Sequence, residues 1–222
     1  MSLLRVLLAI IFPPLAVADQ GCGSVLIVFL LTLCGWIPGV IAALVILNKV
    51  NTELVKLFKS YVKVDGVLPS SQDVEKRWPD IAPEYMVDAV PLISDYPMVS
   101  IAWAGYLGMA VAHDWDDDWE LLKGRPYKEF YGKQGFDDLD ENVVEHILHL
   151  PLDSPQAADI EAMMRRLAQQ ALTLMRREKI EPQSRAAFYA YSRVLTIMFR
   201  LGASMELLRL GYVCQKVNMP LC

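Results

Sequence analysis

The chain has 222 residues, 54% of them hydrophobic, and its 21 Lys and Arg against 26 Asp and Glu leave a formal net charge of −5. This acidic balance argues against nucleic acid as a partner, because phosphate backbones attract clustered basic charge. The cysteines show no metal-ligand spacing and predict no zinc site; they are Cys22, Cys34, Cys214 and Cys222.

The first 48 residues hold only two charged side chains, Arg5 and Asp19. Two apolar runs, residues 1–18 and 24–48, flank a short polar turn. Residues 25–47 carry no charge and are long enough to cross a hydrocarbon layer of about 30 Å as a helix. The first run is shorter, so it must thin the bilayer, lean on its partner helix or remain partly interfacial. The sequence therefore predicts a two-pass transmembrane hairpin.

A cleaved secretory signal is the alternative reading of this start. Arg5, a short apolar stretch and Ala16-Val17-Ala18 before Asp19 have the form of a signal peptide with a small-residue cleavage site. Against it, Pro13-Pro14 interrupts the apolar stretch, and a second long apolar run follows within a few residues.

Three sequence segments in this hairpin resemble the Pmp3/YqaE family of small proteolipids. They are Phe12-Pro13-Pro14-Leu15-Ala16-Val17, Gly21-Cys22-Gly23, and the run from Leu31 to Leu44 with Trp36-Ile37-Pro38-Gly39 at its centre. The resemblance covers residues 1–49. It implies a two-pass plasma-membrane protein linked to salt and cold stress and to control of membrane potential. It brings no catalytic residues and does not extend to the remaining chain.

Small residues and prolines predict how the hairpin packs. Gly35 and Gly39 lie four apart on one helical face, with Ala42 and Ala43 a turn further on. Small residues at this spacing let two helix backbones approach closely in lipid. Kinks are expected at the prolines of the two runs, Pro13, Pro14 and Pro38. The second run holds no acidic, basic or histidine side chain, so ion transport by this hairpin alone is not expected.

Flanking charges predict the orientation of the hairpin. The turn carries only Asp19, whereas basic residues flank both outer ends: Arg5 on one side, and Lys49, Lys56, Lys59 and Lys63 on the other. The positive-inside rule then places both termini in the cytoplasm, as a multi-pass protein of the plasma or inner membrane.

Residues beyond the hairpin read as all-α. We expect an amphipathic helix and linker over 50–70 and a helical cytoplasmic domain over 71–222. Leu54, Leu57, Phe58 and Tyr61 form an apolar stripe on the first helix, which either lies on anionic lipid or packs on the domain. Ser71 is expected to cap the next helix, and Pro79, Pro83, Pro91 and Pro97 to divide the following chain into short pieces.

Residues 96–112 form an uncharged segment rich in Gly and Ala. A buried central helix, crossed closely by others, is favoured over a third membrane span. A helix is then expected from Asp138 to Leu150, one from Ser154-Pro155 to about Lys179, and one from Glu181-Pro182 to about Lys216. The last two should form a long antiparallel αα-hairpin.

Candidate chemistry is sparse. His113 with Asp114, Asp116, Asp117 and Asp118 is the densest polar cluster and the only weak candidate for a metal site. It fails the calcium-loop pattern, so a solvated acidic helix end is favoured. Glu145 and His149 are four apart on one helical face without a second copy of a di-metal motif.

The sequence therefore favours a non-enzymatic membrane protein without a cofactor. It pairs a hairpin in the lipid bilayer with a helical domain that binds a protein partner or a second copy of the chain. The alternative is a ligand-binding or metal-dependent catalytic helical module that the hairpin anchors.

Overall fold

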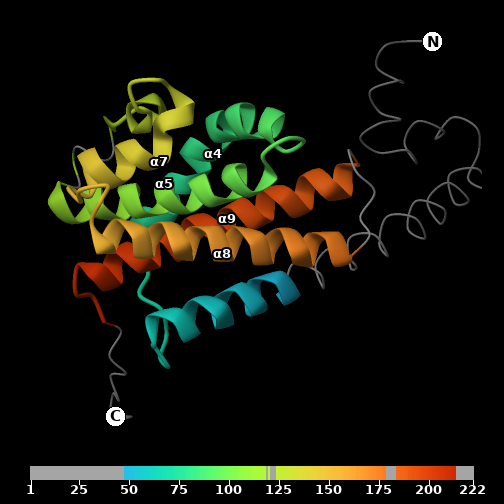
Figure 1. Ribbon diagram of the computed structural model, residues 1–222, viewed down its shortest axis with the longest axis horizontal. Helices are drawn as coiled ribbons and strands as arrows, with labels where there is room; N and C mark the ends of the chain where they lie inside the picture. Colours follow the sequence, from blue (N-terminus) through green and yellow to red (C-terminus); the bar gives the residue numbers. More distant parts are fainter. Residues whose placement is uncertain (1–47, 119, 121–123, 179–183, 214–222) are drawn as a thin grey trace, which may run out of the picture. The chain divides into compact units, whose positions relative to one another are not determined.

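The computed structural model describes residues 48–118, 120, 124–178 and 184–213 (Figure 1). The chain divides into two compact units, Met1–Asn48 and Lys49–Cys222. In the described residues every regular element is helical, which confirms the all-α prediction. Among these described helices, none combines the length and the apolar character that a membrane span requires. Outside the described residues lie the predicted hairpin and its packing and kink residues, Gly35, Gly39, Ala42, Ala43, Pro13, Pro14 and Pro38.

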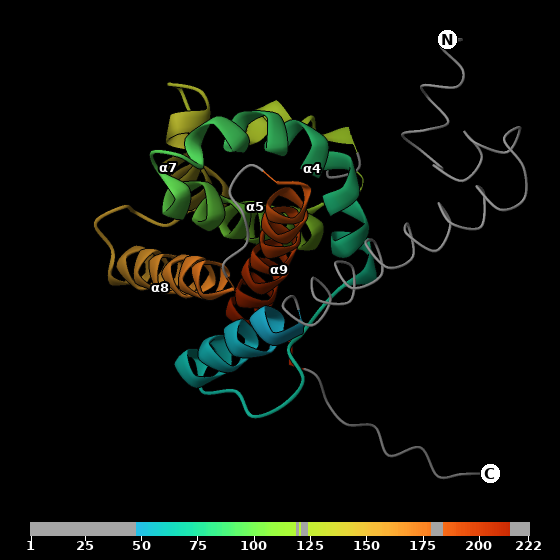
Figure 2. The same ribbon diagram turned by 90° about the vertical axis from the view of Figure 1, so that its right-hand side faces the viewer.

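Helix α5 (Pro97–Asp117) is the centre of the second unit. Helices α4 (Gln72–Leu92), α8 (Pro155–Arg177) and α9 (Arg185–Arg209) all pack on it, and α9 makes the most extensive contact (Figures 1 and 2). Its residues from Trp103 to Ala112 are all buried. From Trp103 onward the uncharged segment 96–112 is therefore a buried core helix, as expected, because other helices surround it; Tyr96, Met98 and Val99 at its start are exposed.

Glycines bring α5 and α9 into backbone contact. A Cβ at Gly108 would stand 1.9 Å from the carbonyl oxygen of Phe199, and a Cβ at Gly202 would stand 1.9 Å from that of Gly105. Real Cβ atoms are never so close to a neighbour, so only glycine fits these positions. Without these glycines the two helices could not cross at this distance.

The expectation that prolines divide residues 79–97 into short pieces is wrong. Helix α4 continues through Pro79, Pro83 and Pro91. All three prolines lie on the exposed side of the helix, while the opposite side is buried at Val74, Trp78, Ile81, Tyr85 and Ala89. Burial of this continuous apolar face outweighs the backbone hydrogen bonds that the prolines remove. Ser71 is the N-cap residue, as expected, but its side chain makes no capping bond.

Residues 48–62 form a helix that packs on the unit through Val50, Leu54 and Phe58, each at most 1% exposed. Of the two readings of its apolar stripe, packing on the domain is therefore the correct one. Lys49 forms an ion pair of 3.2 Å with Glu178, the residue that follows α8. This pair joins the first residues of the helix to the C-terminal end of α8.

The segment between α5 and α8 is less regular than expected. It contains the 3-10 turns η2 (Tyr127–Phe130) and η3 (Phe136–Asp138), then α7 (Leu139–Asn142) and a π-helical turn, η4 (Val143–Ile147). The predicted helix from Asp138 to Leu150 is therefore present over residues 139–147, where it passes without a break from an α-helix to a π-helical turn. His149 follows with φ +55°, a backbone conformation that ends the helix ahead of Pro151.

Helices α8 and α9 run in opposite directions, as an αα-hairpin requires, but each packs mainly on α5 rather than on the other (Figure 1). Ser154 caps α8 by accepting a hydrogen bond from the backbone N–H of Ala157, as its Ser-Pro sequence predicts. Helix α9 ends at Arg209, earlier than expected. Gly211 takes φ +93°, and Tyr212 N–H bonds to the Leu207 carbonyl, the Schellman pattern that stops a helix.

Candidate functional site

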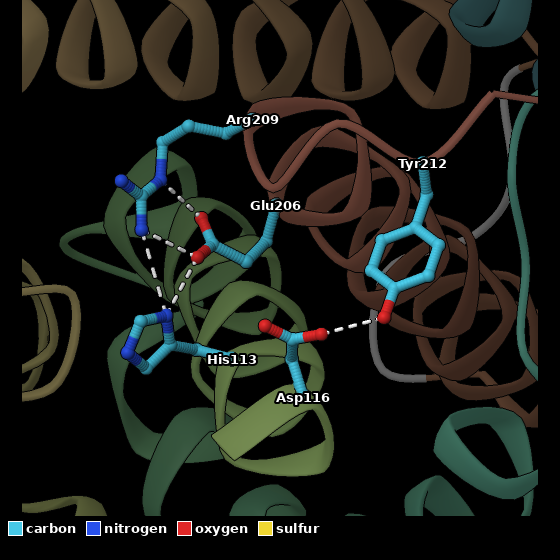
Figure 3. Close-up of polar contacts among 5 residues, drawn as sticks. All are labelled: His113, Asp116, Glu206, Arg209 and Tyr212. Carbon is cyan, nitrogen blue, oxygen red and sulfur yellow. Dashed lines mark hydrogen bonds and ion pairs between the residues drawn. The ribbon is translucent and has the colours of Figure 1, made fainter.

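The densest set of polar contacts lies where the C-terminal ends of α5 and α9 meet. Gly105 faces Gly202, and further along the same helices His113 bonds to Glu206, so the two helices run parallel. Their last turns carry His113, Glu206 and Arg209, and Asp116 and Tyr212 lie beside them (Figure 3). We call the first three residues the His113–Glu206–Arg209 cluster.

Glu206 is the buried centre of this cluster. Its side chain is 0% exposed, and both carboxylate oxygens accept hydrogen bonds. His113 Nδ1 lies 2.8 Å from Oε1, and Arg209 donates from Nε to Oε2 at 2.7 Å and from Nη2 to Oε1 at 2.6 Å. Burial alone would raise the pKa of Glu206, but the hydrogen bonds from His113 and Arg209 outweigh it and lower that pKa below its usual value.

The carboxylate fixes the tautomer of His113. An ionised carboxylate only accepts hydrogen bonds, so Nδ1 of His113 must carry the proton. The ring of His149 meets that of His113 edge to face, with centroids 5.9 Å apart. A histidine oriented by a carboxylate can act as a base in catalysis. Among the described residues, however, no Ser, Thr or Cys side chain bonds to His113, so the cluster holds no assembled nucleophile.

The carboxylates of the acidic segment, residues 114–118, point to different partners. Asp114 is paired with Arg125; burial raises the pKa of Asp114 against the charge of Arg125, which lowers it. Asp116 accepts a hydrogen bond of 2.6 Å from the Tyr212 hydroxyl, and Asp117 and Asp118 are exposed. In the described part of the chain, no three His, Cys, Asp or Glu residues converge in a way that could hold a metal ion. The acidic helix end is thus solvated except at Asp114.

Sequence reasoning missed Glu206, Arg209 and Tyr212. A signal was present, because Glu206 is the one charged residue in the apolar run Leu201–Leu208, and Arg209 follows it at i+3 spacing. A charge on the buried face of a helix requires a partner. That partner, His113, lies 93 residues earlier in the sequence. It reaches Glu206 only because α5 and α9 pack in parallel.

A second polar feature lies between α5, α7 and α8. Two cavities of about 150 and 260 Å³ share Tyr106, Asp140 and Glu161 as lining residues. Burial raises the pKa of Asp140, against a hydrogen bond with Trp103 that lowers it. Neither cavity is lined by His113 or by the acidic segment.

Comparison with known proteins concerns the other unit. The family model described as "Proteolipid membrane potential modulator", Pmp3, matches residues 2–47. Plasma membrane proteolipid 3 of Cryptococcus neoformans var. neoformans serotype D, strain JEC21, is 49% identical over 50 residues, which are 22% of this chain and 88% of the relative. The protein of the same name from Aspergillus fumigatus is 49% identical over 47 residues, 20% of this chain and 82% of the relative. The chain belongs to the Pmp3 family. No solved structure matches it.

Membership of the Pmp3 family confirms the resemblance that residues 12–44 carry. The match ends at residue 47, so the His113–Glu206–Arg209 cluster and the two cavities lie in the part of the chain that these relatives do not contain.

Proposed function

We propose that the chain is a non-enzymatic plasma-membrane protein in which a Pmp3-type hairpin, residues 1–49, anchors a cytoplasmic helical domain. One observation carries this proposal: nearly the whole length of a proteolipid is matched here, and a separate compact unit begins at Lys49. The hairpin crosses the membrane twice, with both termini in the cytoplasm. Residues 50–70 connect it to the domain over 71–222, which binds a protein partner or a second copy of the chain.

The names of the relatives and of the family support a role in the plasma membrane and in the control of membrane potential. A function in stress adaptation follows from the family resemblance. The arrangement of His113 supports the non-enzymatic part of the proposal. Its Nδ1 is committed to Glu206, a buried carboxylate that also neutralises Arg209, so this set serves to join α5 and α9.

Reporter fusions test the topology. Fusions after Asn51, after Asp80 and at Cys222 should all report a cytoplasmic location. An external signal at Cys222 alone would contradict a cytoplasmic domain. Intact-mass measurement of the membrane-extracted protein tests the hairpin: loss of Met1–Ala18 would restore the signal-peptide reading.

The cavities around Asp140 favour a second candidate function, a ligand-binding module that the hairpin anchors. Asp140 is a carboxylate beside the rings of Trp103 and Tyr106, a combination that suits a small organic cation, whereas Glu161 is already paired with Arg165, which lines the same cavity. Tetramethylammonium should then raise the unfolding temperature of the full chain, and Asp140→Asn should abolish that shift. An equal shift in both proteins would exclude this candidate.

A further inference from the structure

One end of the second unit gathers the ends of five helices. Residue 48 begins its helix there, and the Lys49–Glu178 pair places the C-terminal end of α8 beside it. The N-terminal ends of α5 and α9 and the C-terminal end of α4 lie at the same end of the unit, which is at the right in Figure 1 and faces the viewer in Figure 2. We call this the residue-48 end.

The residue-48 end exposes large apolar side chains. Tyr96 is 62% exposed, Phe188 57% and Tyr189 44%, and smaller exposed fractions belong to Val90, Met98 and Val99. Single exposed apolar residues are common, but several at one end of a domain mark a contact surface. These residues come from the last turn of α4, the α4–α5 connection and the first turns of α5 and α9.

Basic side chains accompany this apolar surface. Arg176 and Arg177 form the exposed last turn of α8, Arg185 opens α9, and the side chain of Lys49 is 57% exposed. Among the described residues of this end, the acidic groups are Glu178, which is paired with Lys49, and the exposed Asp95.

The opposite end of the unit is acidic. Asp116, Asp117 and Asp118 are exposed at the C-terminal end of α5, and Asp159 and Glu161 are exposed in the N-terminal half of α8. Helix α8 alone thus passes from acidic to basic residues toward the residue-48 end. Acidic side chains therefore gather at the C-terminal end of α5 and basic ones at the residue-48 end, although Lys63, which follows the helix over residues 48–62, is a basic exception away from the residue-48 end.

We propose that the residue-48 end is a docking surface for the anionic headgroup region of the membrane. The inference rests on the proposed function, because the membrane segment joins the unit at residue 48 and holds that end within reach of the bilayer. Aromatic and aliphatic side chains enter the interface, and the arginines pair with acidic headgroups. The acidic end faces away from a surface of like charge. Helices α5 and α9 then point their N-terminal ends at the membrane.

Fluorescent labels on the full chain in lipid vesicles test this orientation. Val90→Cys and Tyr189→Cys place a polarity-sensitive dye on the docking surface, and Asp117→Cys places it at the acidic end, each with the native cysteines replaced by serine. The vesicles contain phosphatidylcholine with or without phosphatidylserine, and a nitroxide on the headgroup of some lipids quenches the dye. We expect quenching at residues 90 and 189 only with phosphatidylserine, and none at residue 117.

A pair of charge variants tests the arginines. Each basic side chain near an anionic surface contributes about 1 kcal/mol, so Arg176→Gln with Arg177→Gln should lower the ratio of docked to undocked protein about 25-fold. Lys56→Gln with Lys59→Gln removes the same charge from the helix over residues 48–62 and should leave that ratio unchanged. Loss of docking in the lysine variant alone would overturn the proposal.

The remaining outcomes of the vesicle experiments distinguish a failure of the docking proposal from a failure of the proposed membrane anchor. Equal quenching at all three positions, or quenching at residue 117 alone, would overturn the orientation. A dye shift at residues 90 and 189 that depends on protein density and not on lipid charge would assign the surface to a second copy of the chain and overturn the lipid proposal. Failure of the chain to float with vesicles would refute the membrane anchor itself.

Discussion

Gly105 and Gly202 lie in direct backbone contact, and a Cβ at Gly202 would stand 1.9 Å from the Gly105 carbonyl oxygen. This contact sets the distance between two parallel helices whose residues are far apart in sequence. A turn later, Gly108 meets the Phe199 carbonyl in the same way. The His113–Glu206 bond continues this register at the end of the two helices.

Replacement of Gly202 should separate α5 from α9. Gly202→Ala forces a backbone shift in a packed core, so we expect the free energy of unfolding to fall by about 3 kcal/mol or more. Gly66→Ala is the matched control, because nothing lies within 4 Å of a Cβ there. Denaturant unfolding of the full chain in detergent measures both, and equal stability of the two variants would contradict the close crossing.

Removal of the charge on Glu206 should leave Arg209 and His113 without their shared acceptor. Because hydrogen bonds to a charged group contribute about 1.5–3 kcal/mol, Glu206→Gln should lower the free energy of unfolding by about 2 kcal/mol. Glu53→Gln breaks an exposed pair with Lys56 and should cost less than about 1 kcal/mol. A Glu206→Gln protein as stable as its parent would show that the cluster does not join the helices.

The cluster should also make stability depend on acid. Glu206 has a lowered pKa in the folded chain relative to the usual 4.5, so its contribution to stability is complete above pH 4.5. That contribution is lost as the pH falls through the folded pKa. The difference in unfolding free energy between the parent and Glu206→Gln should therefore shrink below pH 4.5. A difference that is constant down to the lowest folded pH would refute this linkage.

The acidic end of α5 should bind no metal tightly. Asp114 is already paired with Arg125, and Asp116 accepts from Tyr212, so the carboxylates share no common point. Calorimetric titration of the full chain with Ca²⁺, Mg²⁺, Mn²⁺ and Zn²⁺ should give no site with a Kd below about 100 μM. A stoichiometric micromolar site that Asp116→Asn or His113→Ala removes would instead favour a metal-dependent module.

Within the hairpin, Gly35 and Gly39 are expected to form the helix contact. Gly35→Leu or Gly39→Leu puts a bulky side chain between two helices in lipid and should weaken their association by about 1 kcal/mol or more. Val40→Leu is the control, because it adds bulk next to this face and not on it. Fluorescence energy transfer between labels on the two helices measures the association. Equal transfer in the two glycine variants and in the Val40→Leu control would place the helix contact elsewhere.

Two features of the second unit, its central helix and the start of α8, were predictable because a local sequence pattern is enough to specify each of them. The uncharged Gly and Ala composition of residues 96–112 predicts a buried helix with close neighbours, and Ser154-Pro155 predicts the start of α8. Both signals are local, so the structure confirms them.

The errors arise where tertiary packing decides. Prolines predict helix ends, but the continuous apolar face of α4 keeps Pro79 and Pro83 within one helix. Sequence proximity predicts that α9 packs on α8, but the glycines of α5 and α9 allow a closer contact than the larger side chains of α8 do. The Glu206 site followed from that unexpected pairing, so no local pattern near His113 could locate it.

The parallel pairing of α5 with α9 also constrains the order of events on the ribosome. Gly202 is made 97 residues after Gly105, which at 5–20 residues per second corresponds to a delay of roughly 5–20 s. Through that interval α5, whose residues 97–112 carry no charge, has no α9 to cover it. A nascent chain with its first segment already at the membrane must therefore keep α5 out of the lipid until α9 has been made, so the biogenesis of this protein should depend strongly on chaperones that bind apolar nascent helices.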